Sequence, residues 1–168
     1  MAATTYERHG THGAVSSTHH LATTTAMAIL ARGGNAFDAA VAGGFVLQVV
    51  EPHMCGPGGE VPVVFVTAGD PTPRVLCGQG VAPARATTAL LRDELGLAAI
   101  PGTGLLPAMV PGAWDGWLTL LRDHGTLPLA DVLGPALGYA ADGFPLVGPV
   151  RSTIGAVEQH FREHWPSS

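Results

Sequence analysis

Glycine, histidine and cysteine gather in one short stretch of the chain, His53-Met-Cys-Gly-Pro-Gly-Gly-Glu60. Glycine-rich turns can hold phosphates, but a phosphate-binding loop needs a Lys-Ser/Thr pair after its glycines and must open a helix. Here Glu60 follows the glycines, and the next residues predict a strand. The pattern favours a tight turn over a nucleotide site, although its backbone N–H groups could approach a bound substrate. No cofactor is implied.

A second candidate for chemistry is the set His19, His20, His53 and Cys55. Histidine and cysteine bind zinc, yet a single His-x-Cys lacks the paired spacings of a metal site. We expect His53 and Cys55 to pack in or near the loop, because free cysteine often behaves as a small buried hydrophobe. His19 and His20 are expected to flank the first helix, and no metal site is predicted.

Nucleophilic chemistry finds weak support in the residue pattern. The chain has no Gly-x-Ser-x-Gly, and neither cysteine has His and Asn at an informative spacing. Ser16, Ser17 and Thr18 precede His19, but neighbours on a strand point to opposite faces, which argues against a Thr18–His19 dyad. No catalytic residue is assigned within the 168 residues.

The elements that must position these residues alternate between short strands and helices. Asn35 is a good N-cap with Asp38 in the first helical turn, and the following helix should be buried on most sides and end at Glu51-Pro52. The mixture predicts an α/β or α+β fold behind a loose arm at residues 1–12. The predicted strands are 13–18, 61–66 and 73–78, with a turn at 68–72; the predicted helices are 21–30, 35–50, 86–95, 114–124, 128–140 and one from 157 that stops at Pro166.

The amino-acid composition argues against some classes of binding partner. Only 12% of residues are charged and 46% are hydrophobic, so the chain is not disordered over most of its length. A net charge of -5 offers no platform for nucleic acid or an anionic membrane. The N-terminus does not resemble a secretory signal, so we expect a cytoplasmic protein in which Cys55 and Cys77 are reduced.

Several motifs resemble the γ-glutamyltransferase family. Gly33-Gly-Asn-Ala-Phe-Asp-Ala-Ala40 is similar to that family's G-G-N-A-x-D-A-A signature, within a longer similar run from Gly13 to Ala42. Glu51 to Gly59 resembles the Gly-rich segment that follows, and Ala82 to Thr87 resembles the A-P-x-x-A-T element. Further similar motifs follow in the expected order as Val110-Pro-Gly112, His124-Gly-Thr-Leu-Pro128 and the stretch from Pro135 to Phe144, so the resemblance covers about residues 13–150.

The resemblance implies an N-terminal-nucleophile (Ntn) hydrolase with an αββα sandwich. Family members cleave themselves, and the new N-terminal threonine of the second subunit attacks a γ-glutamyl amide. That threonine normally lies far downstream of these motifs. Residues 13–168 are therefore expected to be an incomplete N-terminal portion, inactive alone, whose partners are the downstream small subunit and a small γ-glutamyl or acyl-amide substrate.

One substrate-binding position falls within the matched region. The family's D-x-R-E-x-A-P stretch supplies an arginine for the glutamyl α-carboxylate, and Gln79 stands at that position in Cys77-Gly-Gln-Gly-Val-Ala-Pro83. Losing a charge-assisted pair costs about 1.5–3 kcal/mol of binding. Arg74 or Arg85 could substitute, or each could be a solvated surface residue.

A second departure is Glu60, which follows the glycines where the family more often continues with glycines and an aromatic residue. Together the two changes point to a branch with a different acyl group, such as the cephalosporin-acylase-like amidases. The alternative is a non-catalytic remnant or binding module on the same scaffold.

Overall fold

A computed structural model describes residue 7 and residues 9–102 and 104–167, in two compact units. The first unit contains residues 1–56 and 121–168, and the second contains residues 57–120. Of the predicted N-terminal arm, residues 1–6 and 8 lie outside the described residues. The prediction of one domain over residues 13–168 stays a prediction.

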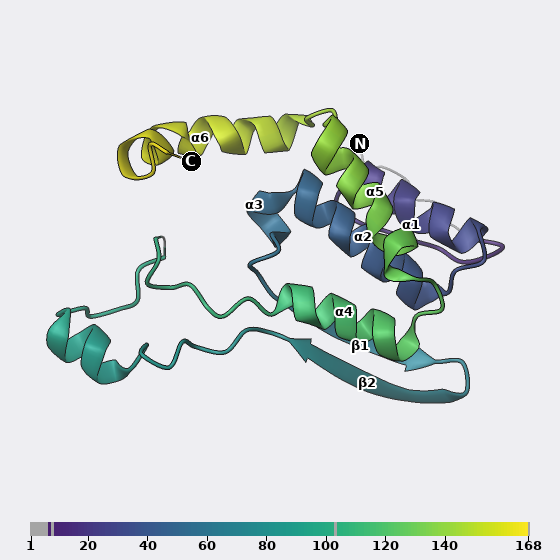
Figure 1. Ribbon diagram of the computed structural model, residues 1–168, viewed down its shortest axis with the longest axis horizontal. Helices are drawn as coiled ribbons and strands as arrows, with labels where there is room; N and C mark the ends of the chain where they lie inside the picture. The colour runs from purple at the N-terminus through teal and green to yellow at the C-terminus, as the bar shows by residue number, and fades with distance from the viewer. Residues whose placement is uncertain (1–6, 8, 103, 168) are drawn as a thin grey trace. The chain divides into compact units, whose positions relative to one another are not determined.

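Helices predominate among the described residues, with one antiparallel hairpin (Figure 1). The predicted mixture of helix and sheet is therefore confirmed. No helix in the described part of the chain is long and apolar enough to cross a membrane. The elements are α1 (His20–Ala31), α2 (Ala36–Val50), α3 (Pro52–Cys55), β1 (Val61–Thr67), β2 (Asp70–Gly78), the π-helix η1 (Ala89–Glu94), α4 (Ala113–His124), α5 (Leu129–Asp142) and α6 (Gly148–His164).

Helix α2 is the core of the first unit, packed against α1 and α5 (Figure 1). Its Val41, Phe45 and Val46 are buried, because the helix is apolar on most of its surface. Small residues permit the close approach of α1, whose Ala22 and Ala26 are also buried. The prediction of a helix buried on most sides is confirmed.

The N-terminus of α2 is fixed by a capping box. The side chain of Asn35 accepts hydrogen bonds from the backbone N–H groups of Phe37 and Asp38, while Asp38 Oδ2 accepts one from the N–H of Asn35 at 2.8 Å. Asn35 Nδ2 also donates to the carbonyl oxygen of His124 at 2.7 Å. The cap thus reaches a segment far along the chain.

Asp38 makes the second link to that segment. Its fully buried carboxylate accepts hydrogen bonds from the N–H of Thr126 at 2.9 Å, the hydroxyl of Thr126 at 2.7 Å and the N–H of Leu127 at 3.2 Å. Burial raises the pKa of this carboxyl, but the hydrogen bonds from Thr126, Asn35 and Leu127 outweigh it and hold the pKa below its ordinary value. Asp38 is therefore buried as a charged, fully bonded group.

One predicted strand is wrong and one helix end is confirmed. Residues 13–18 form no strand, because a strand needs a hydrogen-bonded neighbour and the described ladder joins only β1 and β2. Helix α1 begins at His20, with the Nδ1 atom of His19 accepting from the N–H of Leu21. It ends before Gly33, whose φ of 92° suits glycine.

The hairpin is tighter than predicted. Strands β1 and β2 are joined through Ala68-Gly69, whereas the sequence pattern predicted a turn over residues 68–72. Asp70 lies opposite Thr67, and the register is irregular between Phe65 and Thr67, where Pro71 and Pro73 cannot donate to a ladder. From Phe65 back to Val61 the pairing is regular, and Val61 lies opposite Gly78.

The later helices agree with the sequence in part. Helix α4 confirms the predicted helix at 114–124, and α5 confirms the one at 128–140. Only residues 89–94 of the predicted 86–95 helix are helical, as a π-helix, and α6 begins at Gly148 rather than 157. Helix α6 tolerates Pro149 because its missing N–H falls in the first turn, where helical N–H groups have no partner.

Replacing Asp38 with asparagine should destabilise the protein. In asparagine an NH2 group, which cannot accept a hydrogen bond, replaces one of the two carboxylate oxygens. At least one of the four buried donors therefore loses its partner. We expect Asp38→Asn to lower the free energy of unfolding by about 1–3 kcal/mol in urea titrations. The matched control, Asp131→Asn, changes an exposed first-turn residue of α5 and should have a smaller effect. Equal losses in the two variants would contradict the role given to Asp38.

The same carboxylate predicts a dependence of stability on pH. Because the pKa of Asp38 is lower in the folded protein, its contribution is fully present above the unfolded pKa of about 3.9 and is lost as pH falls through the folded pKa. The difference in unfolding free energy between wild type and Asp38→Asn should therefore be constant from pH 7 to 5 and shrink below about pH 4. A difference that stays constant down to pH 2 would show that ionisation of Asp38 is not the cause.

Candidate functional site

Gln79 lies directly after β2, and the hairpin decides what it meets. Val61 pairs with Gly78, so the next pair of residues beyond the ladder is Glu60 and Gln79. Gln79 Nε2 donates to Glu60 Oε2 at 3.1 Å. The residue before β1 and the residue after β2 are thereby joined across the open end of the hairpin.

The other end of the Gln79 amide is also occupied. Its Oε1 accepts from the thiol of Cys77, with 3.6 Å between sulfur and oxygen. Cys77 lies near the end of β2, two residues before Gln79, a spacing that puts both side chains on the same side of the extended chain. With the oxygen turned to Cys77 and the nitrogen to Glu60, the orientation of the amide is set by its neighbours.

Cys77 and Gln79, but not Glu60, line an open surface cavity of about 310 Å³ within the second unit. Cys77 and Gln79 line one side, and Asp115 and Thr119 of α4 line the other. A volume of this size accepts a small acyl group or a comparable organic fragment. Among the described residues, Asp115 is the one carboxylate that lines the cavity.

Glycines let α4 begin directly against the end of β2. A Cβ at Gly112 would lie 2.5 Å from the carbonyl oxygen of Gly78, so only glycine fits there. The N–H groups of Gly112 and Ala113 both donate to the carbonyl oxygen of Gly59, at 3.1 and 3.0 Å. The glycine-rich loop, the end of β2 and the start of α4 therefore form one connected wall.

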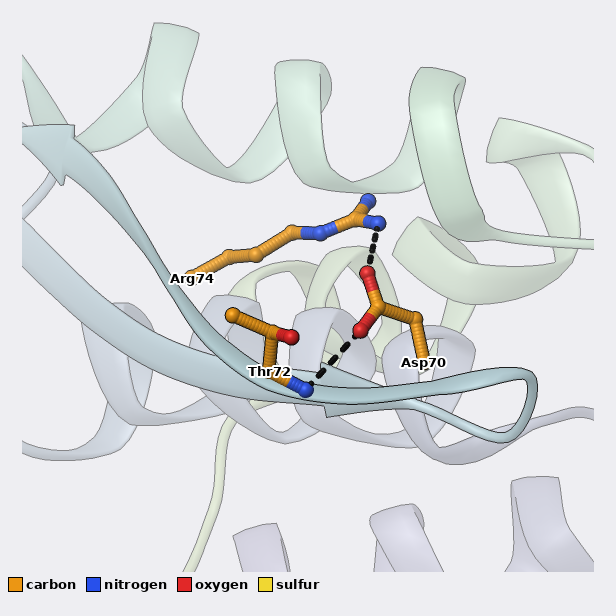
Figure 2. A network of polar contacts seen from close by, with 3 residues as sticks. All are labelled: Asp70, Thr72 and Arg74. Carbon is orange, nitrogen blue, oxygen red and sulfur yellow. Dashed lines mark hydrogen bonds and ion pairs between the residues drawn. The ribbon is translucent and has the colours of Figure 1, made fainter.

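Arg74 does not replace the missing arginine. Its Nη2 donates to Asp70 Oδ2 at 2.7 Å, and Asp70 Oδ1 accepts from the N–H of Thr72 at 2.9 Å (Figure 2). These bonds lower the pKa of Asp70 to about 2, with Arg74 the largest cause. The pair lies beside the turn of the hairpin, at the opposite end from Gln79. Arg85 is exposed and does not line the cavity.

A second polar cluster lies in the first unit where α2 ends. The Thr18 hydroxyl donates to Glu51 Oε2, and Glu51 is 8% exposed. The backbone carbonyl of Glu51 accepts from the N–H groups of Met54 and Cys55 and from the Cys55 thiol. Glu51 thus holds the short helix α3 that opens the glycine-rich segment.

His19 completes this cluster without contacting Thr18 by a hydrogen bond. The ring is 2% exposed and stacks on His20 with 4.7 Å between centroids. Burial lowers its pKa, His20 lowers it further and Glu51 partly offsets both, which favours the neutral ring. Because Nδ1 accepts from Leu21, the proton is on Nε2, which is buried and has no hydrogen-bond partner.

The other predicted positions agree in part with the sequence analysis. Cys55 is half-buried, whereas His53 is exposed within α3 rather than packed. His20 opens α1 as expected. Among the residues that the structure describes, no group of three His, Cys, Asp or Glu could hold a metal ion.

Sequence reasoning missed the partner of Gln79. In the sequence, Glu60 is only a departure from the glycine pattern, and nothing in its neighbours identifies position 79. The correct hairpin register would have predicted that Glu60 and Gln79 lie side by side, but the predicted turn was three residues too long.

The two cysteines should differ in reactivity. Burial raises the pKa of the Cys55 thiol, and the Glu51 carboxylate raises it further. Cys77 is exposed. Because the thiolate is the reactive form, iodoacetamide at pH 7.5 should label Cys77 several times faster than Cys55, as measured by peptide mass spectrometry. Cys77→Ser should remove the fast phase, and faster labelling of Cys55 would contradict the structure.

Comparison with known proteins adds an independent line of support. Residues 22–168 match the family described as Gamma-glutamyltranspeptidase. The chain is 43% identical over 139 residues to the glutathione hydrolase-like YwrD proenzyme of Bacillus subtilis, covering 82% of this chain and 26% of the relative. It is 40% identical over 144 residues to the acylase ACY 1 proenzyme of a Pseudomonas species, covering 80% and 25%. The chain therefore spans about a quarter of the length of these relatives.

Solved structures agree with this assignment. The structure titled LmbA2991HD is 58% identical with a TM-score of 0.84, over 89% of this chain and 25% of that one. The γ-glutamyltranspeptidase of Helicobacter pylori is 30% identical with a TM-score of 0.88, over 96% of this chain and 47% of that one. The predicted Ntn-hydrolase-type α+β fold is thereby confirmed. The chain belongs to the γ-glutamyltranspeptidase family, in a branch close to the acylases.

Proposed function

We propose that this chain is the N-terminal part of an enzyme that hydrolyses acyl amides or transfers their acyl groups. The observation that carries the proposal is the cavity beside Gln79, which stands at the position where the family resemblance expects the arginine for a glutamyl carboxylate. Gln79 is the proposed substrate-binding residue. A pocket of about 310 Å³ with an oriented amide on its wall suits recognition of a small acyl group.

The nucleophile in this proposal is a threonine outside residues 1–168. By analogy with the family, we expect it at the new N-terminus of a second subunit after self-cleavage, where its own α-amine would serve as the base for its hydroxyl. Two relatives are named proenzymes, which supports a precursor that matures by cleavage. The second subunit is the proposed partner, and a cytoplasmic location stays a prediction.

The proposed substrate is a small acyl amide that need not be γ-glutamyl. Arginine would offer a carboxylate a charged, two-pronged donor, whereas Gln79 offers one neutral amide whose two ends already have partners. The similarity to an acylase supports a change of acyl group. A glutathione substrate is the narrower version of the same proposal, supported by the similarity to a glutathione hydrolase-like protein.

The test is expression of the complete reading frame that contains residues 1–168. Mass spectrometry should show a second fragment that begins with threonine, and the protein should turn over at least one of γ-glutamyl-p-nitroanilide and a set of neutral acyl p-nitroanilides. Replacing the new N-terminal threonine with alanine should abolish turnover. A frame without such a threonine, together with no turnover, would support the alternative, a non-catalytic protein on the same scaffold.

Restoring an arginine at position 79 should increase γ-glutamyl turnover. In the complete protein, Gln79→Arg should raise kcat/KM for γ-glutamyl-p-nitroanilide about tenfold, because a charge-assisted bond to the α-carboxylate is worth about 1.5–3 kcal/mol. Gln79→Met removes the amide without adding charge and should give no such increase. No gain with arginine would remove Gln79 as the cause of a changed specificity.

A further inference from the structure

We infer that Glu60 sets the acyl specificity of this cavity, so that it accepts acyl groups presenting an N–H donor and rejects acyl groups with a free carboxylate. The inference rests on the proposed function and names its substrate class. It assigns a role to Glu60 that follows from the hairpin register and from the charges around the cavity.

The first step is the fixed position of the Glu60 carboxylate. Its Oε2 accepts from Gln79 Nε2 at 3.1 Å, and Gln79 is in turn oriented by the Cys77 thiol. Gln79 and Cys77 both line the cavity. Glu60 itself is exposed and does not line the cavity, so its negative charge lies one hydrogen bond away from the lining amide that replaces the family's arginine.

The second step is the absence of a compensating cation in the described part of the second unit. This unit holds three arginines, at positions 74, 85 and 92, and no lysine. Arg74 is paired with Asp70 beside the turn, and neither Arg85 nor Arg92 lines the cavity. Asp115 is the one carboxylate among the described lining residues, and Glu60 adds a second negative charge next to the lining residue Gln79. The polar groups at this wall thus favour a donor or a positive charge and oppose a carboxylate.

The N-terminus of α4 borders the same cavity, and a helix N-terminus by itself favours an anion. Here its N–H groups at Gly112 and Ala113 are both bonded to the carbonyl oxygen of Gly59. Asp115 already supplies a negative charge in the first turn. Two N–H groups at this helix end are therefore already bonded, and the negative charges of Asp115 and Glu60 oppose a substrate carboxylate.

A pair of substrates that differ only in this charge provides the test. γ-Glutamyl-p-nitroanilide and its α-carboxamide share the amine, the chain and the scissile amide. In the complete wild-type protein, kcat/KM should be about five- to tenfold higher for the carboxamide, the size of a like-charge repulsion near a protein surface. Glu60→Gln should reduce this preference at least about threefold, mainly by improving turnover of the carboxylate compound.

Glu94→Gln is the matched control. It makes the same change at an exposed residue of η1 that does not line the cavity, and it should leave the preference unchanged. Raising the salt concentration should screen the repulsion and narrow the preference in wild type but not in Glu60→Gln.

Two results would overturn the inference: a wild type that prefers the carboxylate compound or treats the pair alike, or a preference that Glu60→Gln leaves intact. Turnover of no amide at all counts against the proposed function instead. In that case the affinities of the two compounds for the wild-type protein are compared by calorimetry. Equal affinities would overturn the role of Glu60. If Glu60→Gln does not mature, the same binding comparison and the salt series in wild type provide the readout.

Discussion

The buried carboxylate of Asp38 is the interaction on which the first unit depends. It closes the capping box of α2 and also holds Thr126 and Leu127, so one side chain fixes both the start of the central helix and the segment that leads into α5. A buried charge is costly unless it is fully hydrogen-bonded, and here four donors meet its two oxygens. Helices α1 and α5 both pack on the helix whose start this carboxylate fixes.

The second unit depends on a register rather than on a buried charge. Two residues in the turn determine that Glu60 and Gln79 meet beyond the last pair of the ladder. A slip of one residue would turn every side chain to the opposite face and separate the two. The ion pair between Asp70 and Arg74 spans the irregular stretch with its two prolines, where the ladder itself is weak. The chemistry at position 79 is thus a consequence of turn geometry.

Local signals in the sequence identified most of the helices. The boundaries of α1 and α2 were predicted correctly from Gly33, from Asn35 with Asp38, and from Glu51-Pro52. Caps and prolines act on the adjacent backbone, so their effect can be predicted from the sequence. The strand predicted at residues 13–18 failed because pairing depends on a distant neighbour that propensity cannot supply. Gln79 could be identified from a local motif. That Glu60, Cys77 and Asp115 lie around it could not be predicted, because this depends on the hairpin register and on the position of α4. The early start of α6 was missed because Gly148 and Pro149 are residues of low helix propensity, although the first turn tolerates them.

The bonds between Asp38 and Thr126 join residues 88 positions apart in the sequence, and the whole of residues 57–120 lies within the loop that they close. The entropy of closing a loop grows only with the logarithm of its length, so doubling it costs about 0.6 kcal/mol. Insertions or deletions within residues 57–120 therefore change the stability of the helical unit very little. Evolution is therefore free to reshape the hairpin, the π-helix segment and the cavity that β2 and α4 line without rebuilding the helices of the first unit.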